Sequence, residues 1–174
     1  MAVFLGDFSK LTLKDALDLA VLIEEEAKGR YIEMAEQMRL HHTPEAAFFF
    51  NFMAENEEKH RAELAIRRVQ LFGDAPPRVT PAMLFDVEAP EYDEVRAFMS
   101  AREALRVAFG AEKKAYAFFA EALPRILHPS VKVLFAELRD EEVHHQNLVL
   151  AQLEKTPPES LLKAADVVDE PVAQ

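Results

Sequence analysis

The chain has 174 residues, half of them hydrophobic, and its 31 acidic and 20 basic side chains give a net charge of −11. This surplus of acid excludes a nucleic-acid binder, which needs a basic surface to displace counterions. The absence of Cys excludes disulfides, zinc-thiolate sites and iron–sulfur or rubredoxin centres, and no apolar run approaches the roughly 18 residues of a membrane-spanning helix.

Helix capping signals and apolar spacing predict four long helices. We expect them at 13–40, 44–72, 100–123 and 129–153. Thr12 with Asp15, and Ser100 with Glu103, match the capping box at the start of the first and third helices. Gly73 is a typical residue after the end of the second helix. The apolar residues within these segments recur mostly at three- and four-residue steps, which is typical of amphipathic helices.

The segment 74–99 carries four prolines and is too long for a tight turn. A helix of about 28 residues is about 42 Å long at roughly 1.5 Å per residue, a distance that these 26 residues can span. We therefore predict a crossover that makes the third helix run parallel to the second, with short helical turns near 81–86 and 92–98. The expected architecture is an all-α four-helix bundle over 1–155, followed by a tail, 156–174, with one short helix.

The two halves of the chain repeat each other. Residues 24–35 align with 112–123 at an offset of 88, and residues 54–64 align with 138–148 at an offset of 84. The chain is therefore predicted to contain two helical hairpins related by a pseudo-twofold axis. The alignment pairs Glu24 with Glu112, Glu57 with Glu141, and His60 with His144.

These repeated residues lie in phase with the apolar face of each predicted helix. Glu57-x-x-His60 and Glu141-x-x-His144 each place a carboxylate and an imidazole one turn apart. Buried acids need a partner or a metal, and four carboxylates carry the charge that two divalent cations neutralise. An oxygen-rich donor set with two imidazoles suits iron or manganese.

On these motifs the chain resembles the rubrerythrin-like members of the ferritin-like superfamily, over about 13–153. The stretch EEEAKGRYIEMA, with Glu seven residues before Tyr, is similar to the first helix of rubrerythrins. The resemblance implies a ferritin-like bundle with two iron ions, manganese being the alternative metal. Glu57 and Glu141 would bridge the ions, and Glu24 and Glu112 would be terminal ligands. The implied ligands are Glu24, Glu57, His60, Glu112, Glu141 and His144.

The sequence departs from peroxide-reducing rubrerythrins in one ligand. Those proteins carry a further Glu three residues after the third-helix ligand, where this chain has Ala115, and the mirrored position is Ala27. The six-ligand set is therefore more similar to the ferroxidase centres of ferritins and bacterioferritins.

Two positions allow other interpretations. Glu25 and Glu26 adjoin Glu24, but we assign them to a solvated face. Glu142-x-x-His145 is a second match in the fourth helix. It is phased less well against Leu134 and Leu148, so we assign it to the surface or to the surroundings of the ligands.

Tyr31 is the candidate catalytic side chain, because its hydroxyl could donate a hydrogen bond to a ligand carboxylate. Tyr116 could do the same or pack in the core.

The predicted function is to bind a dinuclear non-haem iron centre and to use it for redox chemistry with O₂ or H₂O₂, as a ferroxidase or in iron handling or oxidant defence. The alternatives are a di-iron oxygenase or oxidase acting on an organic substrate, and a non-enzymatic metal-binding helical bundle. We expect an external electron donor, no nucleic-acid partner and, by resemblance, a homodimer. The first ten residues lack a basic region, so we expect no signal peptide and a cytoplasmic location.

Overall fold

The structure is a computed structural model that describes residues 3–85, 87–90 and 99–157. All four predicted helices are present, with ends within two residues of those expected. The turn expected near 92–98 and the helix expected in the tail lie outside the described residues. In chain order the elements are β1 (Val3–Phe4), η1 (Phe8–Lys10), α1 (Leu13–Leu40), α2 (Pro44–Phe72), η2 (Pro81–Met83), β2 (Leu84–Phe85), α3 (Ala101–Ala122), η3 (Leu123–Arg125) and α4 (Pro129–Lys155).

Both predicted capping boxes form. The side chain of Thr12 accepts from the backbone N–H of Asp15, and that of Ser100 accepts from Glu103, with the reciprocal bonds also present. These caps fix where α1 and α3 begin, because they satisfy N–H groups that have no partner within the helix. Thr43 does not cap α2, since its hydroxyl donates instead to the carbonyl of Met38 at 3.0 Å.

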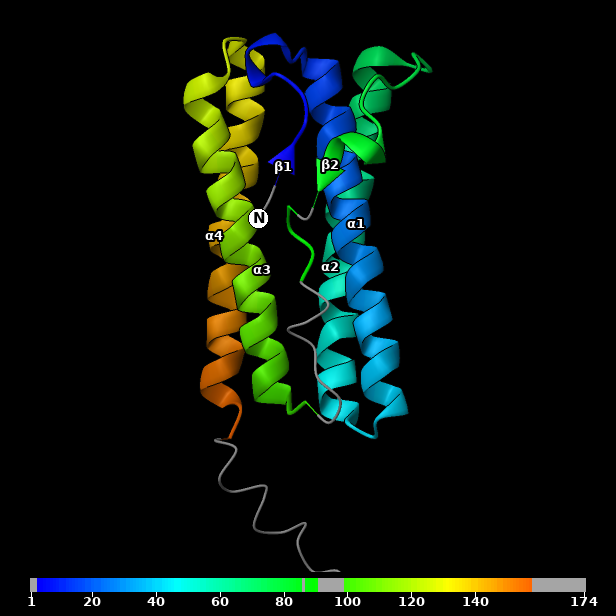
Figure 1. Cartoon of the computed structure of the whole chain (residues 1–174), viewed down its shortest axis with the longest axis vertical. Coiled ribbons are helices and arrows are strands. Elements are labelled where there is room, and N and C mark those ends of the chain that lie inside the picture. Colours follow the sequence, from blue (N-terminus) through cyan, green and yellow to red (C-terminus); the bar gives the residue numbers. More distant parts are fainter. Residues whose placement is uncertain (1–2, 86, 91–98, 158–174) are drawn as a thin grey trace, which may run out of the picture.

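The helices form two hairpins with a long connection between them. α1 lies beside α2 and α3 beside α4, while α2 and α3 run in the same direction (Figure 1). The described part of the crossover, up to Pro90, descends between the two hairpins on one side of the bundle. Its β2 strand pairs antiparallel with β1, in the register Val3 to Phe85 and Phe4 to Leu84. This pairing anchors the crossover to the start of the chain.

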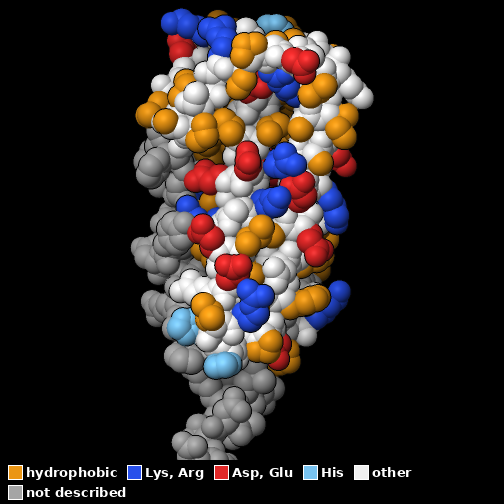
Figure 2. Space-filling model, turned by 90° about the vertical axis from the view of Figure 1, so that its right-hand side faces the viewer, with side chains coloured by type: hydrophobic (Ala, Val, Ile, Leu, Met, Phe, Trp, Pro, Cys, Tyr) orange, Lys and Arg blue, Asp and Glu red, His pale blue; other side chains and the backbone are white. Residues whose placement is uncertain are grey.

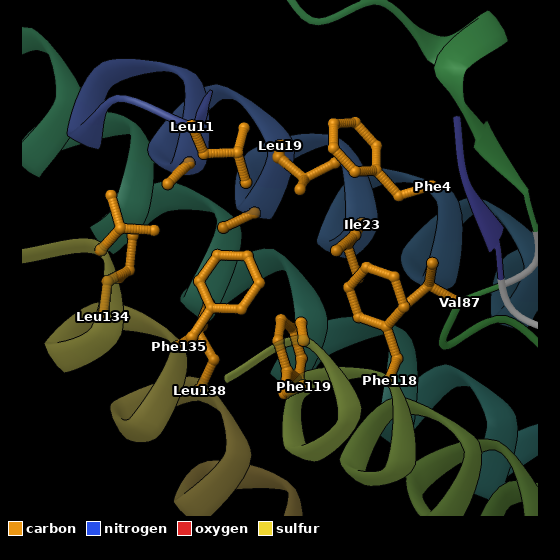
Figure 3. Packing of buried hydrophobic residues seen from close by; sticks show 14 of the residues in the cluster. Phe4, Leu11, Leu19, Ile23, Val87, Phe118, Phe119, Leu134, Phe135 and Leu138 are labelled. Carbon is orange, nitrogen blue, oxygen red and sulfur yellow. The ribbon is translucent and has the colours of Figure 1, made fainter. Parts of the chain in front are cut away.

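The core consists of two apolar clusters, one toward each end of the bundle. The first contains Phe4, Phe8 and the aromatic residues Phe118, Phe119 and Phe135 (Figure 3). The second is built around Met34, Met38, Phe49, Phe50 and Leu105. Along every helix, the residues of one cluster are separated from those of the other by a short central stretch. Each of these four central stretches carries one buried glutamate.

The surface carries charge of both signs. Acidic and basic side chains are interspersed over the face shown in Figure 2. Glu58, for example, accepts from Lys28 and from Arg61 at 2.8 Å. In the described part of the chain, no helix is long and apolar enough to cross a membrane.

Candidate metal centre

Four glutamates point inward at the middle of the four helices. They are Glu24 of α1, Glu57 of α2, Glu112 of α3 and Glu142 of α4, and none exposes more than 3% of its surface. Glu25 is exposed and Glu26 half-buried, so the phase chosen for the first helix is the one that the structure shows. The predicted inward placement of Glu24, Glu57 and Glu112 is confirmed.

The predicted inward placement of Glu141 and His144 is wrong. Both side chains are exposed, whereas Glu142 and His145, which the sequence assigned outside the ligand set, are 2% and 4% exposed. Glu141 lines a cavity of about 150 Å³ together with His60, Glu63 and Glu137. It therefore lies next to the centre, on its outer side.

The error comes from aligning the fourth helix with the second one residue out of register. Leu148 was taken as a core position, but it is 42% exposed, and Val149 is buried in its place. The inward face of α4 runs through Leu134, Leu138, Glu142, His145 and Val149, at steps of three or four residues. An offset of 85 rather than 84 therefore relates α2 to α4, and it pairs Glu57 with Glu142 and His60 with His145.

The two imidazoles of the corrected repeat lie face to face. The rings of His60 and His145 stack with centroids 4.7 Å apart and planes 7° apart. Burial, followed by the neighbouring His145, lowers the pKa of His60, which favours the neutral form that binds metals. Burial would lower the pKa of His145 as well, but its hydrogen bond with Glu112 raises it overall.

Glu112 is held from two sides. Its Oε1 accepts from the Tyr31 hydroxyl at 3.1 Å, and its Oε2 lies 3.0 Å from Nδ1 of His145. Tyr31 is fully buried and its ring stacks on Phe50. Burial, followed by the charge of Glu112, raises the pKa of Tyr31 well above its usual value. Tyr31 is thus a neutral donor that orients this carboxylate, whereas Tyr116 is 38% exposed.

A fifth buried carboxylate comes from the crossover. Glu88 is 1% exposed and offers an oxygen within 4.8 Å of ligand atoms on Glu57, Glu112 and His145. Glu88 was not among the predicted ligands, because it lies outside the helices and has no counterpart in the repeat. The only available signal was an acid in the mainly apolar stretch around Val87 and Ala89.

Most of the carboxylate oxygens in this layer lack a partner. One oxygen each of Glu24 and Glu142, and both oxygens of Glu57 and Glu88, are buried without a hydrogen bond within the described chain. Burial, followed by the charge of Glu88, raises the pKa of Glu24, Glu57 and Glu142 well above its usual value. Burial and then the charge of Glu112 raise the pKa of Glu88 to about 7. Such orphaned acids are either protonated or need a compensating cation to remain ionised.

The donors fall into two overlapping groups that suit a pair of metal ions. Glu57, His60 and His145 have ligand atoms within 4.8 Å of one another, and so do Glu57, Glu88, Glu112 and His145. Glu57 and His145 belong to both groups, so the two groups adjoin each other. The donors are carboxylate oxygens and imidazole nitrogens, which is the chemistry of iron and manganese sites.

A large apolar cavity adjoins the centre. It measures about 970 Å³ and is lined by residues of α2, α3 and α4 and by the chain just after α4. Phe48, Phe52 and Leu148 form part of its wall, and His145 lies at its inner side. The metal centre can therefore be approached from an apolar space.

Comparison with known proteins finds one matching family and several similar structures. The sequence pattern of the family described as Rubrerythrin matches residues 15–153. An uncharacterised conserved protein from Magnetospirillum magnetotacticum is 30% identical, with a TM-score of 0.65 over 85% of this chain and 97% of its own. Among curated proteins, none matches the chain.

Two more distant structures share the fold alone. A bacterioferritin from Rhodobacter capsulatus, solved with a metal-free dinuclear site and a haem iron, is 19% identical, with a TM-score of 0.55 over 81% of this chain and 82% of its own. A hypothetical protein from Pyrococcus furiosus is 21% identical, with a TM-score of 0.52 over 87% and 94%. The predicted ferritin-like four-helix bundle is confirmed.

Proposed function

The chain belongs to the rubrerythrin family, and from this premise we propose that it binds two iron ions in the central acid layer and uses them for redox chemistry with O₂ or H₂O₂. The observation that carries the proposal is the set of orphaned carboxylate oxygens between two dry apolar clusters. The residues that would hold the ions are Glu24, Glu57, His60, Glu112, Glu142 and His145.

The donor set fits this pair of ions. Four ionised carboxylates carry four negative charges, which two divalent cations balance, and two neutral imidazoles complete the donors. Glu57 lies in both donor groups, so its carboxylate could contact both ions, whereas the neutral imidazole of His145 could bind only one of them. A bound pair of iron(II) ions supplies two electrons, which with two protons reduce O₂ to H₂O₂ or H₂O₂ to two waters.

The chain's own side chains prepare the site for that chemistry. Tyr31 fixes one oxygen of Glu112 by a hydrogen bond, and His145 contacts the other. The aromatic residues of the two clusters keep bulk water away from both ends of the acid layer. Fixed carboxylates in a dry site stabilise a change of charge on the metal pair more strongly than mobile ones in water do.

A second candidate function is oxidation of an organic substrate by the same centre. The apolar cavity of about 970 Å³ beside His145 favours it, because a ferroxidase needs no such space. The cavity wall, with Phe48, Phe49 and Phe52, would bind an apolar molecule. A ferroxidase consumes O₂ with Fe(II) alone, whereas the second function also requires an organic substrate.

Anaerobic titration with Fe(II), followed by O₂ and separately by H₂O₂, tests the proposal. We expect two Fe(II) bound per chain and oxidation of both without any organic compound. Oxidation only when an apolar substrate is added would favour the second function. Fewer than one iron bound per chain would contradict both and leave a bundle without a metal-dependent activity.

A further inference from the structure

The crossover delivers Glu88 into the acid layer from outside the four helices. Its side chain is 1% exposed, and its carboxylate lies within 4.8 Å of ligand atoms on Glu57, Glu112 and His145. The neighbouring Val87 packs in the first apolar cluster with Ala115 and Phe118 (Figure 3). Glu88 therefore enters the centre as part of a packed segment.

The backbone on both sides of Glu88 is tied to the bundle. Before it, β2 pairs with β1, and the N–H of Leu5 donates to the carbonyl of Met83 at 2.9 Å. After it, Lys114 of α3 donates to the carbonyl of Ala89 at 2.7 Å. Arg30 of α1 donates to the carbonyl of Pro90, also at 2.7 Å. One cation from each hairpin thus holds the chain directly after Glu88.

Among the described residues, no hydrogen bond to Glu88 explains its burial. Both its oxygens are buried without a hydrogen bond within the described residues. Asp18 shows the alternative, because this buried acid receives bonds from Lys14 at 2.6 Å and from Arg68 at 2.8 Å. Burying a carboxyl group without a hydrogen bond or an ion pair destabilises the folded state. A bound cation would offset this cost.

We propose that Glu88 is an additional metal ligand, supplied by the crossover, and that metal binding through it fixes the crossover to the two hairpins. The proposal rests on the proposed function, since it requires metal ions in the acid layer. Glu88 would serve the ion held beside Glu57 and Glu112. The ion held beside Glu57 and His60 would not depend on Glu88, because the donor group that contains His60 does not include it.

Titration of the full chain with Mn(II), monitored by the EPR signal of free Mn(II), tests this assignment. We expect the wild type to bind two ions and Glu88→Gln to bind one of them at least about tenfold more weakly while keeping the other. Glu141→Gln is the matched control, because it removes an acid next to the centre that does not point inward. This control should bind both ions as the wild type does.

Amide hydrogen exchange at Val87, Glu88 and Ala89 gives a second measurement that does not depend on activity. Mn(II) should slow exchange at these amides in the wild type and in Glu141→Gln, and should leave it unchanged in Glu88→Gln. Equal binding of both ions by Glu88→Gln and the wild type would overturn the assignment and leave the proposed function standing. A wild type that binds no Mn(II) would overturn both. Circular dichroism of the metal-free variants checks that each is folded.

Discussion

The chain buries acid in two places and balances it in two ways. Near the end of the bundle, Asp18 lies between Lys14 and Arg68, and Arg68 also donates to the carbonyls of Gly73 and Ala75. In the central layer, Glu57 and Glu88 are more deeply buried, yet neither has a partner within the described residues. The first arrangement carries its own cations, and the second is complete only when cations come from outside. Burial of an acid therefore indicates a metal site only where the surrounding chain leaves it unpaired.

The largest effect should come from removing two central carboxylates together. We expect Glu57→Gln with Glu142→Gln to bind neither ion, as measured by elemental analysis after loading with Fe(II). The matched double variant, Glu141→Gln with His144→Gln, changes the outward pair on α4 and should keep both ions. Loss of iron from the outward variant would show that Glu141 and His144 are ligands, as first predicted from the sequence.

Asp18→Asn should weaken the fold and leave metal binding intact. It removes the acceptor for two largely buried cations, which costs about 2 kcal/mol of the free energy of unfolding. Because this pair is complete without metal, thermal or urea unfolding should show the same loss in metal-free and metal-loaded protein. A loss of stability in only the metal-free or only the metal-loaded protein would show that Asp18 and the central layer are not independent.

The central layer should make the metal-free protein less stable as pH rises. Burial raises the pKa of Glu24, Glu57 and Glu142 well above 4.5, and that of Glu88 to about 7. The folded state then binds more protons than the unfolded state, so this stabilisation is full below about pH 4.5 and is lost as the pH rises through about 7.

Melting temperatures between about pH 5 and about pH 8 measure this effect. Between these two pH values we expect the melting temperature of the metal-free wild type to fall by several degrees. The fall should be smaller in metal-free Glu57→Gln and as large as in the wild type in metal-free Asp18→Asn. In metal-loaded protein the central carboxylates should not lower the melting temperature over this pH range, since bound cations keep them ionised throughout. A metal-free protein that becomes more stable over this range would contradict the assignment of unpaired acids.

The smallest effect is expected for Tyr31→Phe. This change removes one hydrogen bond to Glu112 and keeps the ring that stacks on Phe50. Mn(II) affinity should fall by about tenfold, because a ligand that has lost its orienting donor is held less firmly. Unchanged affinity would assign Tyr31 to packing alone. The metal-free melting temperature serves as the check on folding.

The fold was largely predictable because its signals are local and repeat. The capping boxes at Thr12 and Ser100 set the start of two helices, and the length of 74–99 required a crossover that spans the bundle. The inward phase of the first and third helices followed from the pairs of Glu24 with Glu112 and Ala27 with Ala115, all of which are buried.

Two features of the centre could not be predicted in this way. On α4, Glu141 and Glu142 each have a His three residues later, and adjacent leucine and valine residues support either phase. Only packing against the other helices decides between Leu148 and Val149. Glu88 lies in a segment without helical periodicity, and distant residues fix the backbone beside it, since Arg30 and Lys114 donate to the carbonyls of Pro90 and Ala89.

The central claim is that two metal ions lie in the layer formed by the four inward glutamates. A crystal structure of the protein loaded with Fe(II) without oxygen, with an anomalous difference map at the iron edge, tests it most directly. We predict two peaks, both within bonding distance of side chains in the set Glu24, Glu57, His60, Glu112, Glu142 and His145. No peak in this layer, or iron bound to Glu141 and His144 on the outer face, would contradict the account.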